Sequence, residues 1–156
     1  MHRVRLVFVG DLKARWAQEA CRHYQEALAR FVRVETAVVR DARESRDVPA
    51  RLRKEGQALL AALGPRERVV GLEIEGEAPG SEGLARQLGR WLDDPGRMPC
   101  FVVGGPYGFG VEARARFDHR LSLGPCTLPH ELARVVLLEQ LYRAMSILAG
   151  HPYHHG

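Results

Sequence analysis

The sequence predicts an α/β fold in which a mostly parallel sheet is flanked by helices on both faces. Three observations predict it: short apolar runs of strand length recur along the chain, stretches with helical spacing of apolar residues separate them, and several of the runs end at glycine. Strands that alternate with helices form parallel sheets, because the helices carry the chain back across the sheet. The 156 residues are expected to form one domain, 1–156, without linkers or repeats.

The expected strands cover residues 4–10, 32–39, 68–76, 99–105 and 120–123. The expected helices cover residues 11–31 and 51–64, a segment begun near Ser81, a short stretch at 111–119 and a long segment after Pro129, which is suited to a first helical turn. Residues 40–50 are polar and are expected to form an exposed loop. The run 99–105 is the most apolar, so we expect it at the centre of the sheet.

The first helix has a regular apolar pattern. Asp11 stands where a capping side chain is needed. The apolar residues recur every four positions and are predicted to form one buried face: Leu12, Trp16, Ala20, Tyr24 and Leu28.

The composition limits the class of protein. Hydrophobic residues make up 46% and charged residues 27%, and no apolar run approaches the roughly 18 residues of a membrane span. The N-terminal apolar run is too short for a signal peptide, so we expect a cytoplasmic protein. Cys21, Cys100 and Cys126 have no paired spacing, which favours reduced, buried thiols over disulfides or zinc.

Arginine dominates the basic residues. Of 23 basic residues only Lys13 and Lys54 are lysines, and the net charge is +4. Arginine binds phosphate through two donors and stacks on bases, which suits RNA. A general preference for arginine codons would give the same composition, so the charge permits nucleic-acid binding without establishing it.

Three loops are expected at one edge of the sheet. Ligands of parallel sheets bind beyond the carboxyl ends of the strands, and the segments found there are 72–76 (LEIEG), 104–110 (GGPYGFG) and 123–129 (LGPCTLP). Glycine lets a backbone approach a ligand closely, and proline fixes the shape of a loop.

A dinucleotide site in the second loop is disfavoured. Gly108, Gly110 and Ala113 satisfy G-x-G-x-x-A, but the next strand begins too soon for the usual crossover helix, and no acidic residue is placed to bind a ribose. The third loop has almost no charge and would suit a flat neutral base such as adenine. From composition alone, an ordinary connection into the last helix is the favoured interpretation of this segment.

Several motifs taken together resemble one family. The segments FVVGGPYGFG, LSLGPCTLPHELARVVLLEQLYRAMSI and HPYHH, supported by RLVFVGDLK, KEGQALL and LEIEG, resemble the SPOUT-class methyltransferases that modify N3 of a pseudouridine in bacterial large-subunit (23S) ribosomal RNA. The resemblance covers nearly the whole chain. It implies an α/β fold with a deep C-terminal trefoil knot, a rare exception to unknotted chains, and a homodimer with its site near the subunit interface.

The resemblance also implies a cofactor, S-adenosylmethionine (SAM), held by the three loops. The implied cofactor-binding residues are Leu72, Gly104, Leu123, Gly124, Pro125, Cys126, Thr127 and Leu128. Cys126 is expected to frame the cofactor and not to act as a nucleophile, because methylation of N3 requires no covalent intermediate with the protein.

The C-terminal tail is expected to lie against the cofactor pocket and to receive RNA. Tyr153 would stack or donate a hydrogen bond, and His151 and His154 would contact phosphate or the target base. His155 stands where the family usually has a more basic residue. A neutral histidine at this position would weaken a phosphate contact. A metal site built from these histidines is disfavoured, because no fourth ligand lies nearby and Pro152 breaks the helical spacing.

The expected catalytic residues lie on the last helix and in the tail. Methyl transfer to N3 needs positioning and removal of a weakly acidic proton. Arg143 is expected to stabilise negative charge on the uracil carbonyls, and either His130 or His154 to accept the proton. Glu139 lies four residues before Arg143 on one helix face, and the pair could equally be an ordinary ion pair.

Two other functions are compatible with these patterns. One is an RNA-binding protein of this class that has lost catalysis, and the other is a methyltransferase of the class that acts on another RNA, such as transfer RNA. The compact chain carries no appended RNA-binding domain, which favours a large assembled substrate, the ribosome, over free RNA.

Overall fold

The computed structural model describes all 156 residues and contains five strands and five helices. In chain order they are β1 (Arg3–Val9), α1 (Arg15–Leu28), β2 (Arg33–Val39), α2 (Val48–Ala62), β3 (Glu67–Glu77), α3 (Gly80–Leu92), β4 (Met98–Val103), α4 (Val111–Arg116), β5 (His119–Leu121) and α5 (His130–Leu148). Each predicted strand and helix is present, with ends shifted by a few residues.

The sheet has the order β2-β1-β4-β3-β5. Every pairing is parallel, which confirms the predicted α/β class. As predicted, β4 lies in the middle, and it is buried apart from its first residue. All five strands therefore end at the same edge, and the loops that follow β3, β4 and β5 can meet there.

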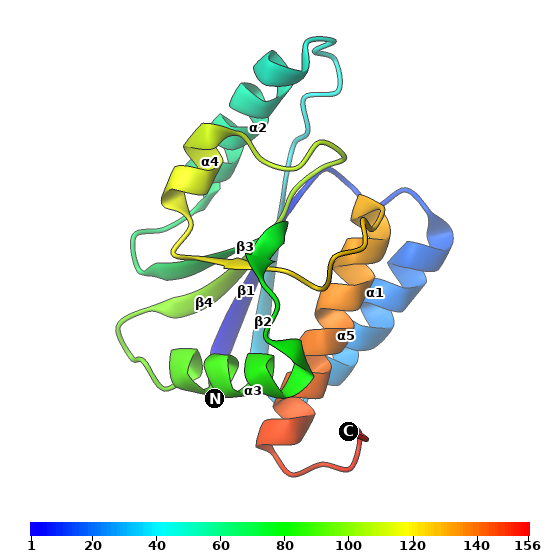
Figure 1. Ribbon diagram of the computed structural model, residues 1–156, viewed down its shortest axis with the longest axis vertical. Coiled ribbons are helices and arrows are strands. Elements are labelled where there is room, and N and C mark those ends of the chain that lie inside the picture. The colour runs from blue at the N-terminus through cyan, green and yellow to red at the C-terminus, as the bar shows by residue number, and fades with distance from the viewer.

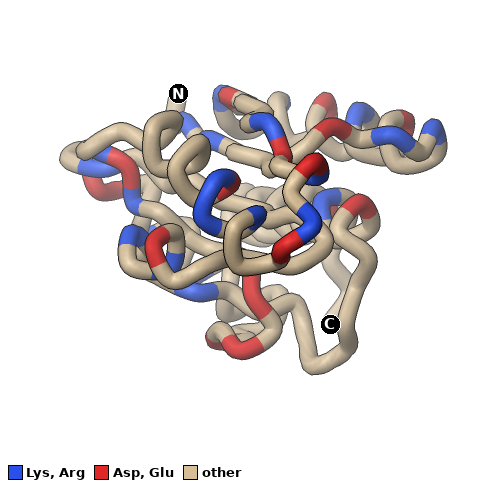
Figure 2. Tube along the Cα trace, turned by 90° about the horizontal axis from the view of Figure 1, so that it is seen from above, with Lys and Arg blue, Asp and Glu red and all other residues tan.

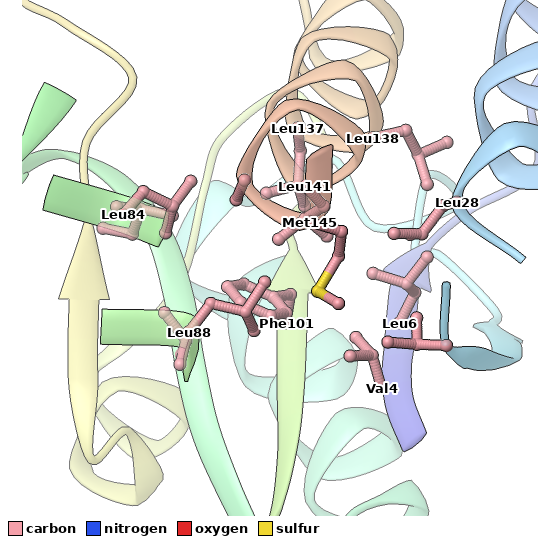
Figure 3. Packing of buried hydrophobic residues seen from close by; sticks show 14 of the residues in the cluster. Val4, Leu6, Leu28, Leu84, Leu88, Phe101, Leu137, Leu138, Leu141 and Met145 are labelled. Atoms are coloured by element: carbon pink, nitrogen blue, oxygen red, sulfur yellow. The ribbon is translucent and has the colours of Figure 1, made fainter. Parts of the chain in front are cut away.

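Helices cover both faces of the sheet (Figure 1). On one face α1, α3 and α5 enclose the larger core, where Leu6 and Phe101 of the sheet meet Leu88 and Leu141 of the helices (Figure 3). On the other face α2 and α4 cover a smaller core that includes Leu59. Alternate residues of β1 enter the two cores, as the period of a strand requires.

The start of α1 differs from the prediction. The helix begins at Arg15, its N-cap residue is Ala14, and Asp11 does not cap it. The carboxylate of Glu131, from the first turn of α5, instead accepts hydrogen bonds from the backbone N–H groups of Lys13 (2.7 Å) and Ala14 (3.2 Å). A partner 117 residues away therefore satisfies amides that the sequence pattern assigned to a local side chain.

The buried face of α1 also differs from the prediction. The buried residues are Ala17, Cys21, Ala27 and Leu28, whereas Trp16 is 54% exposed. A spacing of four residues advances about 40° more than a full turn at each step, so five such residues drift around the helix. Mixed spacings of three and four residues keep a helix face on the core.

The remaining local expectations are largely met. Residues 40–47 form the expected loop, and Asp47 caps α2 by accepting a hydrogen bond from the N–H of Ala50 (3.0 Å). Pro129 is the N-cap residue of α5, one position before the first turn. Cys21 and Cys100 are buried free thiols, but Cys126 is exposed, so the prediction was wrong for that residue.

Basic and acidic positions are interspersed along much of the trace (Figure 2), and many of the arginines form ion pairs with carboxylates. None of the helices combines the length and the apolar character that crossing a membrane would demand. The trefoil knot implied by the family resemblance stays a prediction.

Candidate active site

A cavity of about 280 Å³ lies at the carboxyl edge of the sheet. Segments that follow β4 and β5 line it, together with the carboxyl-terminal half of β3 and the start of α5. Of the eight residues expected to bind the cofactor, seven line this cavity: Leu72, Gly104, Leu123, Gly124, Cys126, Thr127 and Leu128. Pro125 lies in the same loop but does not line it.

An irregularity in β3 opens one wall of the cavity. Leu72 pairs with Leu121 of β5, and the pairing then shifts so that Glu77 also lies opposite Leu121. The intervening residues are left out of the ladder, and Glu73, Ile74 and Glu75 line the cavity. A bulge of this kind redirects side chains and backbone groups at the edge of a sheet.

Two glycines leave room for a ligand at the cavity wall. Gly108 has φ +73° and Gly124 has φ +130°, values that residues other than glycine rarely adopt. A Cβ atom at either position would meet no atom within 4 Å, so the backbone there is open. Ser122 fixes the second of these turns, since its hydroxyl donates to the carbonyl of Gly124 (3.0 Å) and accepts from its N–H (3.1 Å).

The cavity wall offers apolar side chains and backbone groups, and its one buried carboxylate is neutralised. Glu73 is 9% exposed and forms ion pairs with Arg114 (2.6 Å) and Arg120. Such a surface fits a nucleoside better than a polyphosphate, which needs a cradle of backbone amides followed by lysine. Glu73 and Arg114 were not singled out from the sequence, although Glu73 belongs to the LEIEG segment on which the prediction relied.

His130 is the expected catalytic residue that lines the cavity. It is the first residue of α5. Burial, followed by the positive charge of Arg134, lowers the pKa of this imidazole, while Glu131 opposes the shift. The neutral form of His130 is therefore favoured near neutral pH, as a proton acceptor requires.

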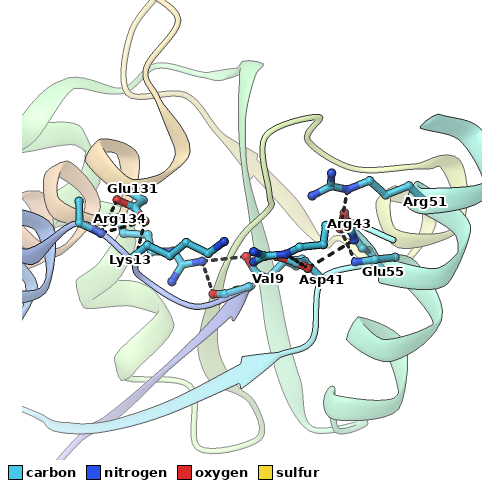
Figure 4. A network of polar contacts seen from close by, with 11 residues as sticks. Val9, Lys13, Asp41, Arg43, Arg51, Glu55, Glu131 and Arg134 are labelled. Atoms are coloured by element: carbon cyan, nitrogen blue, oxygen red, sulfur yellow. Dashed lines mark hydrogen bonds and ion pairs between the residues drawn. The ribbon is translucent and has the colours of Figure 1, made fainter. Parts of the chain in front are cut away.

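Arg134 anchors the turn of α5 that carries His130 (Figure 4). Its side chain is almost completely buried, donates to the carbonyls of Val9 (2.7 Å) and Gly10 (2.5 Å), and lies 4.8 Å from the centre of the Phe8 ring. These are backbone groups at the carboxyl end of β1. Together with Glu131, Arg134 fixes the start of α5 against the edge of the sheet.

The other expected catalytic residues form a separate cluster further along α5. Arg143 donates to Oε1 of Glu139 from Nε (3.1 Å) and Nη2 (2.5 Å), and its Nη1 lies 3.2 Å from Nδ1 of His154. The phenol of Tyr153 donates to the same oxygen of Glu139 (3.0 Å), and its ring centre lies 4.8 Å from the guanidinium of Arg143. Burial, followed by the bond to Glu139, raises the pKa of Tyr153 to about 12.

This cluster does not reach the cavity of its own chain. None of Glu139, Arg143, Tyr153 and His154 lines the cavity. Glu139 lies nine positions after His130, which corresponds to roughly 14 Å along a helix. We expected these residues and His130 to share one site. In the fold, His130 lies at the start of α5, whereas the cluster lies further along this helix and in the tail.

The tail packs on the last turns of α5 and does not cover the cavity of the same chain (Figure 1). Tyr153 lies against Tyr142, with ring centres 4.5 Å apart, and His151 lies edge-on to Phe31 (6.3 Å). His155 is exposed. No group of three or more His, Cys, Asp or Glu side chains is arranged to hold a metal ion.

Solved structures share the fold at low sequence identity. A probable methyltransferase from Bordetella pertussis matches with a TM-score of 0.58 and 18% identity, over 92% of this chain and 96% of that one. A probable methylase family protein from Haemophilus influenzae matches with a TM-score of 0.56 and 12% identity, over 94% of this chain and 66% of that one. These likenesses define the class of fold.

Sequence relatives define the family. The family model described as "Predicted SPOUT methyltransferase" matches residues 2–154. A protein of Solidesulfovibrio magneticus named "Ribosomal RNA large subunit methyltransferase H" is 49% identical over 99% of this chain and 100% of its own length. A protein of Pseudomonas paraeruginosa with the same name is 43% identical over 97% of this chain and 99% of its own. The chain belongs to the SPOUT methyltransferase family.

Proposed function

We propose that the protein transfers a methyl group from S-adenosylmethionine to N3 of a pseudouridine in 23S ribosomal RNA. One observation carries the proposal: three segments far apart in the sequence supply seven of the expected cofactor-binding residues to a single cavity. The relatives named above, which match along their whole length, support ribosomal RNA as the substrate.

The cavity suits the proposed cofactor. Leu72, Leu123 and Leu128 offer apolar contacts for an adenine ring, and the open backbone at Gly108 and Gly124 allows close approach. When bound, S-adenosylmethionine supplies the methyl group and the leaving group. The protein must then hold the base in line with the methyl group and remove the N3 proton.

The charged cluster on α5 supplies the remaining chemistry. The guanidinium of Arg143 stabilises negative charge that develops on the carbonyl oxygens of the base. Glu139 positions Arg143 by accepting two of its N–H groups. Either His130 or His154 accepts the N3 proton.

A homodimer would bring the two halves of the site together. Arg143, Tyr153 and His154 lie away from the cavity of their own chain, so the proposed chemistry needs them at the cavity of a second copy. The sequence of α5 is apolar around much of the helix, and Val135, Tyr142 and Ile147 are only half-buried. An apolar helix face that remains accessible is available to a second copy.

The proposed setting is the assembled ribosome in the cytoplasm. The chain, 1–156, acts as one knotted domain, and docking on a large particle adds to the surface that the chain itself offers to RNA. Its net charge of +4 is modest for a protein that binds free RNA unaided.

Two measurements test the proposal. Mass spectrometry of 23S RNA fragments from a strain that lacks the gene should show one pseudouridine without its N3 methyl group, and purified protein with S-adenosylmethionine should restore it on 70S ribosomes. Calorimetry should detect binding of S-adenosylmethionine. Absence of binding would indicate an RNA-binding protein without catalysis, and restored methylation of transfer RNA instead would assign another substrate.

A further inference from the structure

An uneven distribution of charge marks the segment of residues 40–54, here called the basic segment. It contains six basic and three acidic residues, which leaves three of the four net positive charges of the chain in this stretch. It comprises the loop after β2 and the first half of α2, which lie at the top of Figure 1, at the carboxyl edge of the sheet.

Two of the three acidic residues in the basic segment already have partners. Asp41 pairs with Arg43 (2.7 Å), and Asp47 caps α2. The buried Glu55, directly after the segment, pairs with Arg51 (3.1 Å). The cations that remain without an ion pair are all exposed to solvent: Arg40, Arg46, Arg53 and Lys54. Most of the excess positive charge is therefore free to bind an anion.

The basic segment lies beside the candidate active site. The guanidinium of Arg51 lies 5.1 Å from the ring centre of Tyr107, which lines the cavity and is 55% exposed. Arg51 also contributes to lowering the pKa of His130, which places its charge within electrostatic reach of that residue.

A second hollow extends this surface past the ends of β1 and β2. It has a volume of about 490 Å³, and its lining includes Lys13, Arg40 and Arg43. Asp11 and Asp41 also line it, and Asp41 is held by Arg43. The backbone of Lys13 is bound to Glu131, the neighbour of His130, so this hollow adjoins the start of α5 (Figure 4).

We propose that the basic segment, together with Lys13, binds the phosphate backbone of the RNA beside the base that is methylated. This inference rests on the proposed function. Exposed arginines without carboxylate partners bind phosphate through two donors at once. Contacts of this kind set the position of the RNA and carry no base specificity, which complements a pocket that handles one base. RNA is favoured over an acidic protein because the cations lie next to the cavity that would receive the base.

Matched variants test the proposal by their affinity for 70S ribosomes. The test variant is R40Q/R46Q/R53Q/K54Q. The control, R30Q/R33Q/R86Q/R90Q, removes the same charge from exposed arginines that have no ion pair and do not line the cavity or the second hollow. Near physiological salt, we expect the affinity of the test variant for 70S ribosomes to be at least about tenfold lower than that of the wild type. The slope of log K against log salt should become shallower by about 0.7 for each phosphate that the variant no longer binds. The control should keep most of the affinity.

Two further readouts separate this proposal from the proposed function. Calorimetry with S-adenosylmethionine should give the wild-type affinity for the test variant, which also shows that the variant is folded. A photo-cross-linking amino acid placed at position Arg46 should attach to 23S RNA. Equal weakening by test and control variants, an unchanged salt dependence, or a cross-link to a ribosomal protein would each overturn the inference, even if the wild-type chain methylates ribosomes. Wild-type binding without methyl transfer would instead overturn the proposed function.

Discussion

The side chains of Arg143 and Tyr153 meet on one carboxylate oxygen, Oε1 of Glu139, at 2.5 Å and 3.0 Å respectively. The tail and α5 are joined by this oxygen, because Tyr153 belongs to the tail and Glu139 to the helix. The hydrogen bond from Arg143 to Glu139, ahead of other effects, raises the pKa of Arg143. A permanently charged guanidinium held in a fixed orientation is suited to stabilise an anionic base.

Replacing Arg143 with Ala should therefore remove methyl transfer without removing the cofactor. We expect the rate on 70S ribosomes to fall by about 10²–10³-fold, the cost of losing one preorganised donor, while the affinity for S-adenosylmethionine measured by calorimetry stays at the wild-type value. R143K keeps the charge but not the planar fork, and should retain part of the rate. Equal losses of rate and cofactor affinity would show that Arg143 serves folding.

Replacing Gly104 with Ala should weaken cofactor binding. A Cβ atom there would lie 2.9 Å from the carbonyl oxygen of Gly108, so the second loop must shift. Overpacking of this kind costs about 1–3 kcal/mol, which corresponds to a loss of affinity of about 5- to 150-fold. The neighbouring variant G105A is the matched control, because its Cβ would lie 3.6 Å from the carboxylate of Glu55, an ordinary van der Waals distance. Calorimetry that ranks G105A as the weaker binder would contradict the assigned role of the loop.

The order of strands and helices could be predicted because it depends on local patterns. The apolar run that became β4 is buried on both faces, and such runs occupy the middle of parallel sheets. The orientation of α1 could not be predicted in the same way. Its first amides are satisfied by Glu131, and the exposure of Trp16 depends on how α1 packs against α5.

The candidate site could be predicted as far as its loops and His130 at the start of α5. The three glycine- and proline-containing segments meet because all parallel strands end at one edge. The separation of His130 from Arg143 follows from helical rise, but whether the tail folds back to the cavity depends on tertiary contacts such as that of Tyr153 with Tyr142. The exposure of Cys126 depends in the same way on how its loop is packed.

Replacing Arg134 with Ala should destabilise the protein. The variant would leave the carbonyls of Val9 and Gly10 without their charged donor and would open a cavity against Phe8. A hydrogen bond to a charged group contributes about 1.5–3 kcal/mol, so we expect the free energy of unfolding in urea to fall by about 3 kcal/mol. The exposed R86A should change it by less than about 0.5 kcal/mol. Similar values for the two variants would exclude an anchoring role for Arg134.

The lowered pKa of His130 predicts that stability depends on pH in the mildly acidic range. Burial is its main cause, so the folded protein binds this proton less readily than the unfolded chain, in which histidine has a pKa of about 6.5. Above that value both states are neutral and the residue has no effect. As the pH falls below it, the unfolded chain is protonated first, and stability is lost down to the lowered pKa of the folded state.

The free energy of unfolding of the H130Q variant should therefore fall less than that of the wild type as the pH decreases from about 6.5 to the lowered pKa of His130. Part of the dependence will persist, because burial also lowers the pKa of His119, which acts in the same direction. Asp94 and Asp118 have lowered pKa values as well, but they contribute only at more acidic pH. Urea unfolding midpoints across the range measure the effect, with H155Q, in the exposed tail, as the control for removing a histidine. Parallel curves for wild type and H130Q would contradict a half-buried, neutral imidazole at the cavity.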